Sequence, residues 1–421
     1  MAVVTPLRIG EPILRWSARA HSIADIEREL ARIWATQDLT AEVDGVPGRF
    51  VAARSSVMNL VVIARRPEVA EHCAATIQAL TGRHPSRTMI VGSADPDGPS
   101  WLDARVEAHC VLPREGAPET CAEMIHVTAG GESGRHLAAI VTPLLIHDLP
   151  VTLWWPDEPP LQVKATRDML GAADRLVVDA STWNGDGLDR LRELADLVEA
   201  TRLTVSDFAL VRQSRWREAI ASIFDDPEFL PYLRSLRRVA VTYGTHDETG
   251  TVGFTNLVKP LYHVAWLASR LGLHVVKPLA AITGPAKAGA RTGSGRAVRS
   301  TGAVQTAGRG LGATLSDGRA EVSVVVRPVL SPMPAGTTLR VELLAERRGS
   351  ELRADVTAEA ETVHVRVWQD GVEALDRHFR APRRTDSDLL TEAVESGGRD
   401  SVSVGALRSA ADLVRPIGAA S

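Results

Sequence analysis

The sequence predicts an α/β protein with two α/β units in series, the second with a mainly parallel sheet, followed by a Gly-rich linker and a C-terminal antiparallel β-rich region with closing helices. Three observations predict this. Apolar runs of strand length alternate with helical segments as far as residue 277, as parallel strands joined by helices require. A stretch almost without large apolar residues follows at 284–318. Beyond it, apolar and polar residues alternate with the two-residue period of strands.

The first unit, residues 1–145, is expected to open with an amphipathic helix. Ser22 and Asp25 resemble a capping box at its start. A strand, a helix and a second strand then follow, which is the order of a β-α-β unit. In chain order, the expected elements are a helix at 22–34, a strand at 57–63, a helix opened by Pro67 and closed by Gly82, and strands at 88–91, 104–112 and 124–128.

The second unit, residues 146–283, repeats the alternation of strand and helix. The expected strands are at 149–155, 173–179, 238–243 and 274–277. The expected helices are at 166–170, 188–198 and 257–271, with a longer one starting near Asp207.

The linker, residues 284–318, is rich in small and basic residues and is expected to be flexible, because it cannot bury enough surface to offset its ordering entropy. The C-terminal domain, residues 319–421, is expected to form an antiparallel meander closed by two helices. Its expected strands are at 321–326, 338–344, 352–357 and 362–368, and its helices at 386–394 and 404–414.

Composition excludes several classes of protein. The 48 Lys and Arg residues are outnumbered by 52 Asp and Glu, so nothing in the charge balance favours nucleic acid as a partner. No apolar run approaches the roughly 20 residues of a membrane-spanning helix. The N-terminus lacks a basic segment before an apolar one, so a secretory signal is not expected. These features, with three cysteines outside any paired framework, favour the cytoplasm.

Motifs for catalysis are missing. The sequence contains no G-x-x-x-x-G-K-[ST], no G-x-S-x-G, and no G-x-G-x-x-G that follows a strand and opens a helix. His109, Cys110, Cys121 and His126 match no zinc spacing, so we expect no metal and no cofactor. Cys110 and Cys121 could serve a redox role, because neighbouring strands can bring cysteines within disulfide range. The chain is therefore expected not to be an enzyme.

Three clusters are candidate functional sites. His84, Ser86 and Arg87 follow a helix and precede a strand, where a structural turn and an anion or partner contact are equally good interpretations. Trp154 and Trp155 point to opposite faces of a strand, so either helices cover both faces or one ring is presented at the strand's end; the first is favoured.

The third cluster lies on a predicted helix after Asp207. Arg212 and Trp216 are four residues apart and share a face, whereas Arg215 and Arg217 diverge from it. A core tryptophan beside solvated arginines is modestly favoured over a protein-binding face. The nine tryptophans, as many as Phe and Tyr together, keep the second interpretation open because tryptophan is enriched at interface hot spots.

These clusters, in this order, resemble the glucose-6-phosphate dehydrogenase assembly protein family, OpcA. The resemblance covers residues 50–275 and rests on motifs in fixed order: S-V-M-N-L-V-V (56–62), H-P-S-R (84–87), C-A-E-M-I (121–125), P-L-L-I-H-D-L-P-V-T-L-W-W (143–155), R-Q-S-R-W-R-E-A-I-A-S-I-F-D (212–225) and L-V-K-P-L-Y-H-V-A-W-L-A-S-R-L-G-L (257–273).

The resemblance implies a non-catalytic partner that binds and allosterically activates glucose-6-phosphate dehydrogenase, in the oxidative pentose phosphate pathway. The residues expected to contact the dehydrogenase are Trp154, Trp155, Arg212, Trp216, Arg217 and Trp266. Two alternatives remain. One is a sugar-phosphate-binding enzyme, a lactonase or transferase, with a pocket near His84, Arg87 and His147. The other is a scaffold that changes only the oligomeric state of the dehydrogenase.

Overall fold

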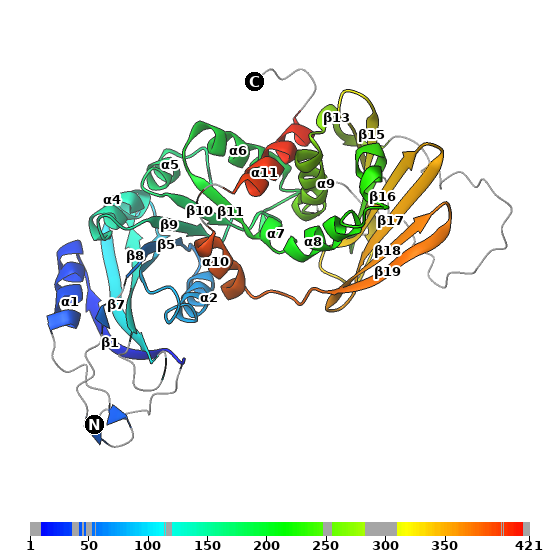
Figure 1. Cartoon of the computed structure of the whole chain (residues 1–421). Coiled ribbons are helices and arrows are strands. Elements are labelled where there is room, and N and C mark those ends of the chain that lie inside the picture. The colour runs from blue at the N-terminus through cyan, green and yellow to red at the C-terminus, as the bar shows by residue number, and fades with distance from the viewer. Residues whose placement is uncertain are drawn as a thin grey trace. The chain divides into compact units, whose positions relative to one another are not determined.

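Figure 1 shows the computed structural model of the chain, which describes residues 10–35, 42–43, 46–47, 53–54, 56–112, 114, 120–246, 255–282, 310–396, 398 and 400–415. The predicted α/β class is confirmed. The chain divides into two compact units. Unit 1 comprises Met1–Val178, Arg202–Ser206 and Thr385–Gly397, and unit 2 comprises Asp179–Thr201, Asp207–Arg384 and Gly398–Ser421.

Unit 1 is built on a nine-stranded mixed sheet with the order β1-β7-β8-β6-β5-β9-β10-β11, in which β4 pairs with β8 off this path. From β8 to β10 the neighbours along this path are parallel, whereas β1, β7 and β8 pair antiparallel. The strands are β1 (Ile13–Ala20), β4 (Ala53–Arg54), β5 (Met58–Ile63), β6 (Ser86–Ala94), β7 (Trp101–Val111), β8 (Thr120–Gly130), β9 (Val151–Trp155), β10 (Arg175–Val178) and β11 (Thr204–Asp207).

The parallel strands form the core of unit 1. All six residues of β5 are buried, as expected for a strand covered on both faces. The chain runs from β5 to β6 and β8 on one side of the sheet, and then returns to the other side of β5 for β9 and β10. The direction of strand addition therefore reverses between β5 and β9, which becomes important below.

The helices of unit 1 largely match the sequence prediction. Pro67 occupies the first turn of its helix, where a missing backbone N–H is tolerated. Ser22 Oγ accepts a hydrogen bond of 3.1 Å from the Asp25 N–H, as in the predicted cap. The helices are α1 (Ile23–Ala35), α2 (Pro67–Gln78), α3 (Gly131–Arg135), α4 (Leu137–Leu144), α5 (Lys164–Leu170) and α10 (Asp386–Glu395).

Helix α10 belongs to unit 1, although the sequence analysis placed it in the C-terminal domain. His72 Nε2 lies 3.0 Å from Asp386 Oδ2, and His84 Nε2 lies 2.9 Å from Glu395 Oε1. Arg175 of β10 donates hydrogen bonds to the carbonyl groups that close the helix. The apolar period predicts a helix but does not show which sheet the helix packs on, so the prediction had the element right and its unit wrong.

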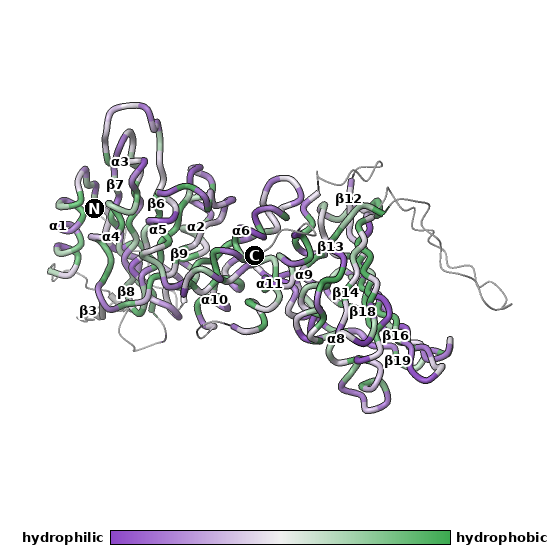
Figure 2. Tube along the Cα trace, turned by 90° about the horizontal axis from the view of Figure 1, so that it is seen from above, coloured by the Kyte–Doolittle hydropathy of each residue, from purple (hydrophilic) through white to green (hydrophobic). Residues whose placement is uncertain are grey.

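Unit 2 is built on an eight-stranded sheet with the order β13-β14-β15-β12-β16-β17-β18-β19. The pairs described are antiparallel except β12–β15, which is parallel. Buried and less buried residues alternate along β14, β15 and β18. Figure 2 shows both hydropathy colours in the region of this sheet that carries the labels β14 and β18. The strands are β12 (Leu236–Thr245), β13 (His274–Ala281), β14 (Leu311–Ser316), β15 (Glu321–Leu330), β16 (Thr338–Arg347), β17 (Ser350–Ala358), β18 (Thr362–Gln369) and β19 (Val372–Arg380).

The helices of unit 2 include the two that carry the family motifs, α8 and α9. Helix α8 contacts β17, β18 and β19, and α9 contacts β12, β15, β16 and α11. The helices are α6 (Leu188–Ala200), α7 (Phe208–Val211), α8 (Ser214–Ile223), α9 (Val258–Leu271) and α11 (Ser401–Val414), with 3₁₀ turns η1 (Ala180–Thr182) and η2 (Leu230–Ser235). None of the helices described in either unit is both long enough and apolar enough to cross a membrane.

Several predicted boundaries are wrong. The boundary at 145/146 falls inside one sheet, because β9 pairs with β5. Strands β12 and β13 join the C-terminal strands instead of a separate parallel sheet. Within the flexible linker predicted at 284–318, residues 311–316 form β14 instead, and residues 283–309 lie outside the described residues. Strand and helix patterns define the order of elements, but not which strands pair.

Candidate partner-binding site

A buried carboxylate, Asp207, lies five residues before the R-Q-S-R-W-R segment in unit 2. Asp207 Oδ1 accepts a hydrogen bond of 2.8 Å from the Ala209 N–H and so caps α7. The same atom accepts one of 3.0 Å from Ala180 N, and Tyr262 Oη donates one of 2.7 Å to Oδ2. Burial, and then the neighbouring Asp179, raises the pKa of Asp207 to about 7, although these hydrogen bonds act to lower it.

The single long helix expected after Asp207 is divided in two. Helix α7 ends at Val211, and α8 begins at Ser214. At the break, Gln213 Nε2 donates a hydrogen bond of 2.7 Å to the Lys259 carbonyl, which ties the start of α8 to α9. The break therefore fixes how the two motif helices meet.

Arg212 lies at this break and pairs with Asp179. Its guanidinium hydrogen-bonds the Asp179 carboxylate and lies 5.8 Å from the centre of the Phe208 ring. Its side chain is 28% exposed and that of Asp179 is 9% exposed. An ion pair this close to the interior holds local structure, so Arg212 has a structural role in addition to any contact with a partner.

Trp216 and Arg217 pack between the motif helices. The Trp216 ring lies 5.2 Å from the ring of His263 on α9, at an interplanar angle of 54°. Arg217 donates a hydrogen bond to the Leu210 carbonyl. Burial, together with the charge of Arg217, lowers the pKa of His263 to about 3, so this imidazole is neutral at pH 7.

An apolar groove of about 300 Å³ lies one turn further along both helices. Ile220 follows Trp216 by four residues on α8, and Trp266 follows His263 by three on α9; both line the groove. Leu230 is 53% exposed at its edge, and Asp225 and Arg270 add opposite charges. An apolar centre containing tryptophan with a charged border is the composition of a protein interface.

Trp154 and Trp155 do not belong to this surface. They lie in β9 of unit 1, with exposed fractions of 2% and 4%. Trp154 is part of the core, whereas Trp155, the last residue of β9, is buried but borders a cavity of unit 1. The burial of both rings argues against a direct contact with the dehydrogenase and agrees with the favoured interpretation of a strand covered on both faces.

His84 lies in the bend before β6, and Ser86 and Arg87 are the first two residues of that strand. Arg87 is 9% exposed, and its Nε donates a hydrogen bond of 2.6 Å to Glu123 Oε2. Ser86 Oγ lies 2.9 Å from Thr88 Oγ1, and His84 is bonded to α10 as described above. The anion or partner contact is therefore wrong for Ser86 and Arg87, because both are buried and already paired.

The pocket expected near His84, Arg87 and His147 is not formed as predicted. His147 lines a separate pocket with His136 and Asp168, whose lining includes neither His84 nor Arg87. Arg87 and His147 do not line a common pocket because the Arg87 side chain points into the core, where its Nη1 also donates a hydrogen bond of 2.9 Å to the Leu144 carbonyl.

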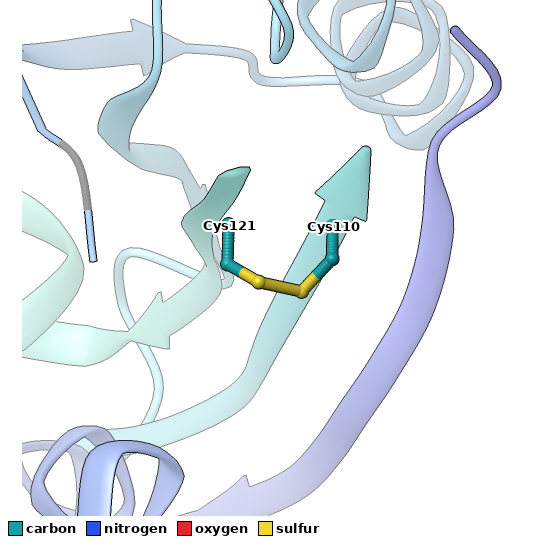
Figure 3. Close-up of a disulfide and its surroundings, with 2 residues drawn as sticks. All are labelled: Cys110 and Cys121. Atoms are coloured by element: carbon teal, nitrogen blue, oxygen red, sulfur yellow. A yellow bond between two sulfur atoms is a disulfide. The ribbon is translucent and has the colours of Figure 1, made fainter. Parts of the chain in front are cut away.

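Cys110 and Cys121 form a disulfide across β7 and β8 (Figure 3). The two residues are directly opposite in the register, with Cα atoms 4.0 Å apart, and both are buried. The expectation that strand pairing can bring them within disulfide range is confirmed, while a redox role stays a prediction. Burial raises the pKa of the free thiol of Cys73 to about 12.

One cluster in unit 2 could hold a metal ion, which the sequence analysis did not anticipate. Glu359, His364 and His378 place one ligand atom each within 4.8 Å of one another. His364 and His378 are opposite in the register of β18 and β19, and their rings stack at 4.0 Å. His364 Nε2 lies 2.9 Å from Asp376 Oδ1, which could orient the ring. Only the strand register, unknown from the sequence, could have revealed this cluster.

The sequence analysis also missed the residues that shape the groove and support its helices. Leu230 and Leu233 line the groove from η2, and Phe224 from the end of α8. The signal available in the sequence was helical spacing: Trp266 and Arg270 share a face of one predicted helix, and Trp216 shares a face of another with apolar residues of its motif. This spacing does not show that the two helices meet. Asp207 and Tyr262 are far apart in sequence, so only the fold brings them together.

The fold and the groove define this chain as a two-unit α/β protein whose second unit carries a Trp-lined apolar groove. Two family models match residues 77–196 and 203–406, and they describe the N-terminal and C-terminal domains of a glucose-6-phosphate dehydrogenase subunit. The chain belongs to the OpcA family.

Two relatives carry names that assign them to the OxPP cycle as OpcA. The protein from Synechocystis sp. is 26% identical over 171 residues, and that from Nostoc punctiforme is 29% identical over the same length. Each match covers 40% of this chain and 34% of the relative. The chain thus spans about a third of the length of the curated relatives it matches.

The solved structures that match this chain share little sequence with it and have low TM-scores. Biliverdin reductase from Synechocystis sp. is 12% identical with a TM-score of 0.42, over 85% of this chain and 98% of the other. Aldose-aldose oxidoreductase from Caulobacter crescentus is 13% identical with a TM-score of 0.41, over 83% and 95%. At this level of similarity we draw no functional argument from them.

Proposed function

We propose that this protein is a non-catalytic accessory subunit that binds glucose-6-phosphate dehydrogenase and activates it allosterically in the cytoplasm. Membership in the OpcA family supports the choice of partner. The observation that supports the proposal is the groove between α8 and α9, because all its lining residues except Leu230 and Leu233 come from two of the family motifs.

Activation requires only a difference in affinity. If the protein binds the active conformation of the dehydrogenase more tightly than the inactive one, a tenfold shift between them needs about 1.4 kcal/mol. A tryptophan seated in the centre of an interface contributes about 2 kcal/mol or more. Trp266, half-buried in the groove, is the candidate for that role.

The test is the rate of the cognate dehydrogenase at subsaturating glucose 6-phosphate, titrated with this protein. We expect a saturable rise in rate. The Trp266→Ala variant should require about 30-fold more protein for half-maximal activation, which corresponds to the loss of a hot-spot side chain. Trp101→Ala is the matched control, because Trp101 is 38% exposed but lies on β7 of unit 1.

Each outcome discriminates between functions. If Trp266→Ala and Trp101→Ala changed the concentration for half-maximal activation equally, the groove would not be part of the contact with the dehydrogenase. Binding without any change in rate would instead indicate a scaffold, and gel filtration of the mixture would then show a changed assembly. An absence of binding would refute the proposal.

A further inference from the structure

Unit 1 contains a cavity of about 600 Å³ at one edge of its parallel sheet. Its lining residues lie at the carboxyl ends of β5, β6 and β9 or in the segments that follow β5, β6, β8 and β9, including α3 and α5. Ile63 and Trp155 are the last residues of β5 and β9, Ser93 is next to last in β6, and Gly134 lies in α3, which follows β8. The cavity is thus formed by the loops that leave a single edge of the sheet.

This edge includes the point where the strand order reverses. The chain continues from β5 towards β6 and β8 on one side, and from β9 towards β10 on the other. The loops after β5 and β9 therefore lead in opposite directions, and a crevice opens between them. Open α/β sheets bind their ligands at this point. The position of the cavity follows from the topology, independently of any sequence motif.

The chemistry of the lining favours an anionic ligand with an apolar part. Ile63, Trp155 and Met169 provide buried apolar surface, while Arg65, Arg135 and His136 provide positive or protonatable groups. No Asp or Glu is among the described residues that line the cavity. A volume near 600 Å³, mostly apolar with a few convergent polar groups, is typical of a small-molecule site.

The cationic groups differ in how they are held. Arg135 pairs with Asp97 and Glu132, and His136 lies 2.9 Å from Glu132, but these two carboxylates are 93% and 65% exposed and are screened by water. Arg65 is exposed and makes no ion pair with the described residues. Arg65 is therefore the group with the most capacity to bind an added anion.

Trp155 supplies a second, independent sign of a ligand. Its side chain is 96% buried and lines the cavity, yet its Nε1–H has no hydrogen-bond partner among the described residues. A buried donor without an acceptor is costly, so an acceptor on a bound molecule would stabilise it. The N-terminus of α4, which has no side-chain cap, also borders the cavity at His136 and Leu137 and favours a phosphate there.

We infer that this cavity binds a phosphorylated small molecule with a flat apolar moiety, the chemistry of a nucleotide. The phosphate is held by Arg65, Arg135 and the first turn of α4, and the flat moiety lies against Ile63, Trp155 and Met169. A sugar phosphate shares the phosphate but would place hydroxyl groups against these apolar side chains, where they lack partners. This inference concerns the chain alone and does not rest on the proposed function.

The test is isothermal titration calorimetry of the full chain with ADP, glucose 6-phosphate and inorganic phosphate, each used separately. We expect saturable binding of ADP and at least about tenfold weaker binding of the other two probes. Tighter binding of glucose 6-phosphate than of ADP would overturn the nucleotide class, and equal binding of all three would reduce the site to a simple anion site. No saturation by any probe at millimolar concentration would refute the site.

Neighbouring arginines provide a matched pair of variants. Arg65→Gln should weaken ADP binding about tenfold or more, because a charge-assisted contact to phosphate is lost. Arg66→Gln should leave it unchanged: Arg66 is equally exposed but pairs with Asp157 at 2.9 Å and does not line the cavity. Trp155→Phe keeps an aromatic ring and removes the N–H, and should weaken binding about fivefold. Equal affinities of the Arg65 and Arg66 variants would contradict the assigned position.

Discussion

Asp207 makes the stability of unit 2 depend on pH in a direction opposite to that of most carboxylates. The group is fully buried, and its pKa is raised from the ordinary value of 3.8 to about 7. The change to examine is Asp207→Asn. An amide keeps Oδ1 as the acceptor for Ala180 and Ala209, and its NH₂ group can donate to Tyr262 Oη, so the three hydrogen bonds of the site are retained without a charge.

The sign follows from proton binding in the two states. Below about pH 3.8, Asp207 is protonated in both the folded and the unfolded chain and costs nothing. Between pH 3.8 and 7 the unfolded chain loses the proton while the folded one keeps it, so the free energy of unfolding falls as pH rises. Above about pH 7 Asp207 is ionised in both states, and the free energy of unfolding is reduced by the full cost of burying its charge. The difference between 3.8 and about 7 corresponds to about 4 kcal/mol.

Urea unfolding followed by tryptophan fluorescence, at intervals from pH 4 to pH 8.5, measures this effect. The variant should match the wild type near pH 4 and exceed its stability by up to about 4 kcal/mol near pH 8. Asp189→Asn is the control, because the Asp189 side chain is 88% exposed on α6. Parallel pH profiles of wild type and Asp207→Asn would refute the reasoning, since they would show that Asp207 ionises alike in both states.

Three further predictions concern unit 1. Arg87→Met should lower the free energy of unfolding by about 3–5 kcal/mol in urea titrations, because it removes the ion-pair partner of the Glu123 carboxylate, which is 1% exposed. A loss below about 1 kcal/mol would contradict the importance of the buried pair. Reducing the Cys110–Cys121 disulfide with dithiothreitol should lower stability by about 2–4 kcal/mol in the wild type but not in Cys110→Ser, as measured by thermal unfolding; equal shifts in both would exclude the disulfide as the cause. Cys73 should not react with a thiol reagent at pH 8 in the folded chain, because its pKa is raised to about 12, and rapid modification of the folded Cys110→Ser/Cys121→Ser variant would contradict its burial.

The elements of this fold were predictable where the apolar pattern was strong. The continuous run in β5 and the Pro67 start of α2 identify a buried strand and its helix. Strand β19 could not be predicted from an apolar pattern, because seven of its nine residues are exposed and only Leu375 and Phe379 are partly buried. Strand β14 was lost within a segment dominated by small residues, although Leu311 and Leu315 are buried by β15 and its neighbours. Pairing between distant strands supplies the information that local sequence lacks.

The candidate site was predictable only in part. Trp266 was identified and lines the groove, and Trp216 was placed on the right helix. Trp154 was assigned to a surface although it is core, because composition cannot distinguish a tryptophan that binds a partner from one that fills a sheet. The cavity at the edge of unit 1 was not predicted at all, since the reversal of strand order between β5 and β9 is a property of the assembled sheet.

The division of the chain between its units has a consequence for biosynthesis. Unit 1 requires Thr385–Gly397, which follow most of unit 2 in the sequence. A ribosome must therefore translate most of unit 2 before the segment that completes unit 1 emerges. Until then, α2 lacks the helix whose Asp386 and Glu395 bind His72 and His84. A premature stop codon between residues 207 and 385 would leave unit 1 incomplete, although every strand of its sheet had already been made.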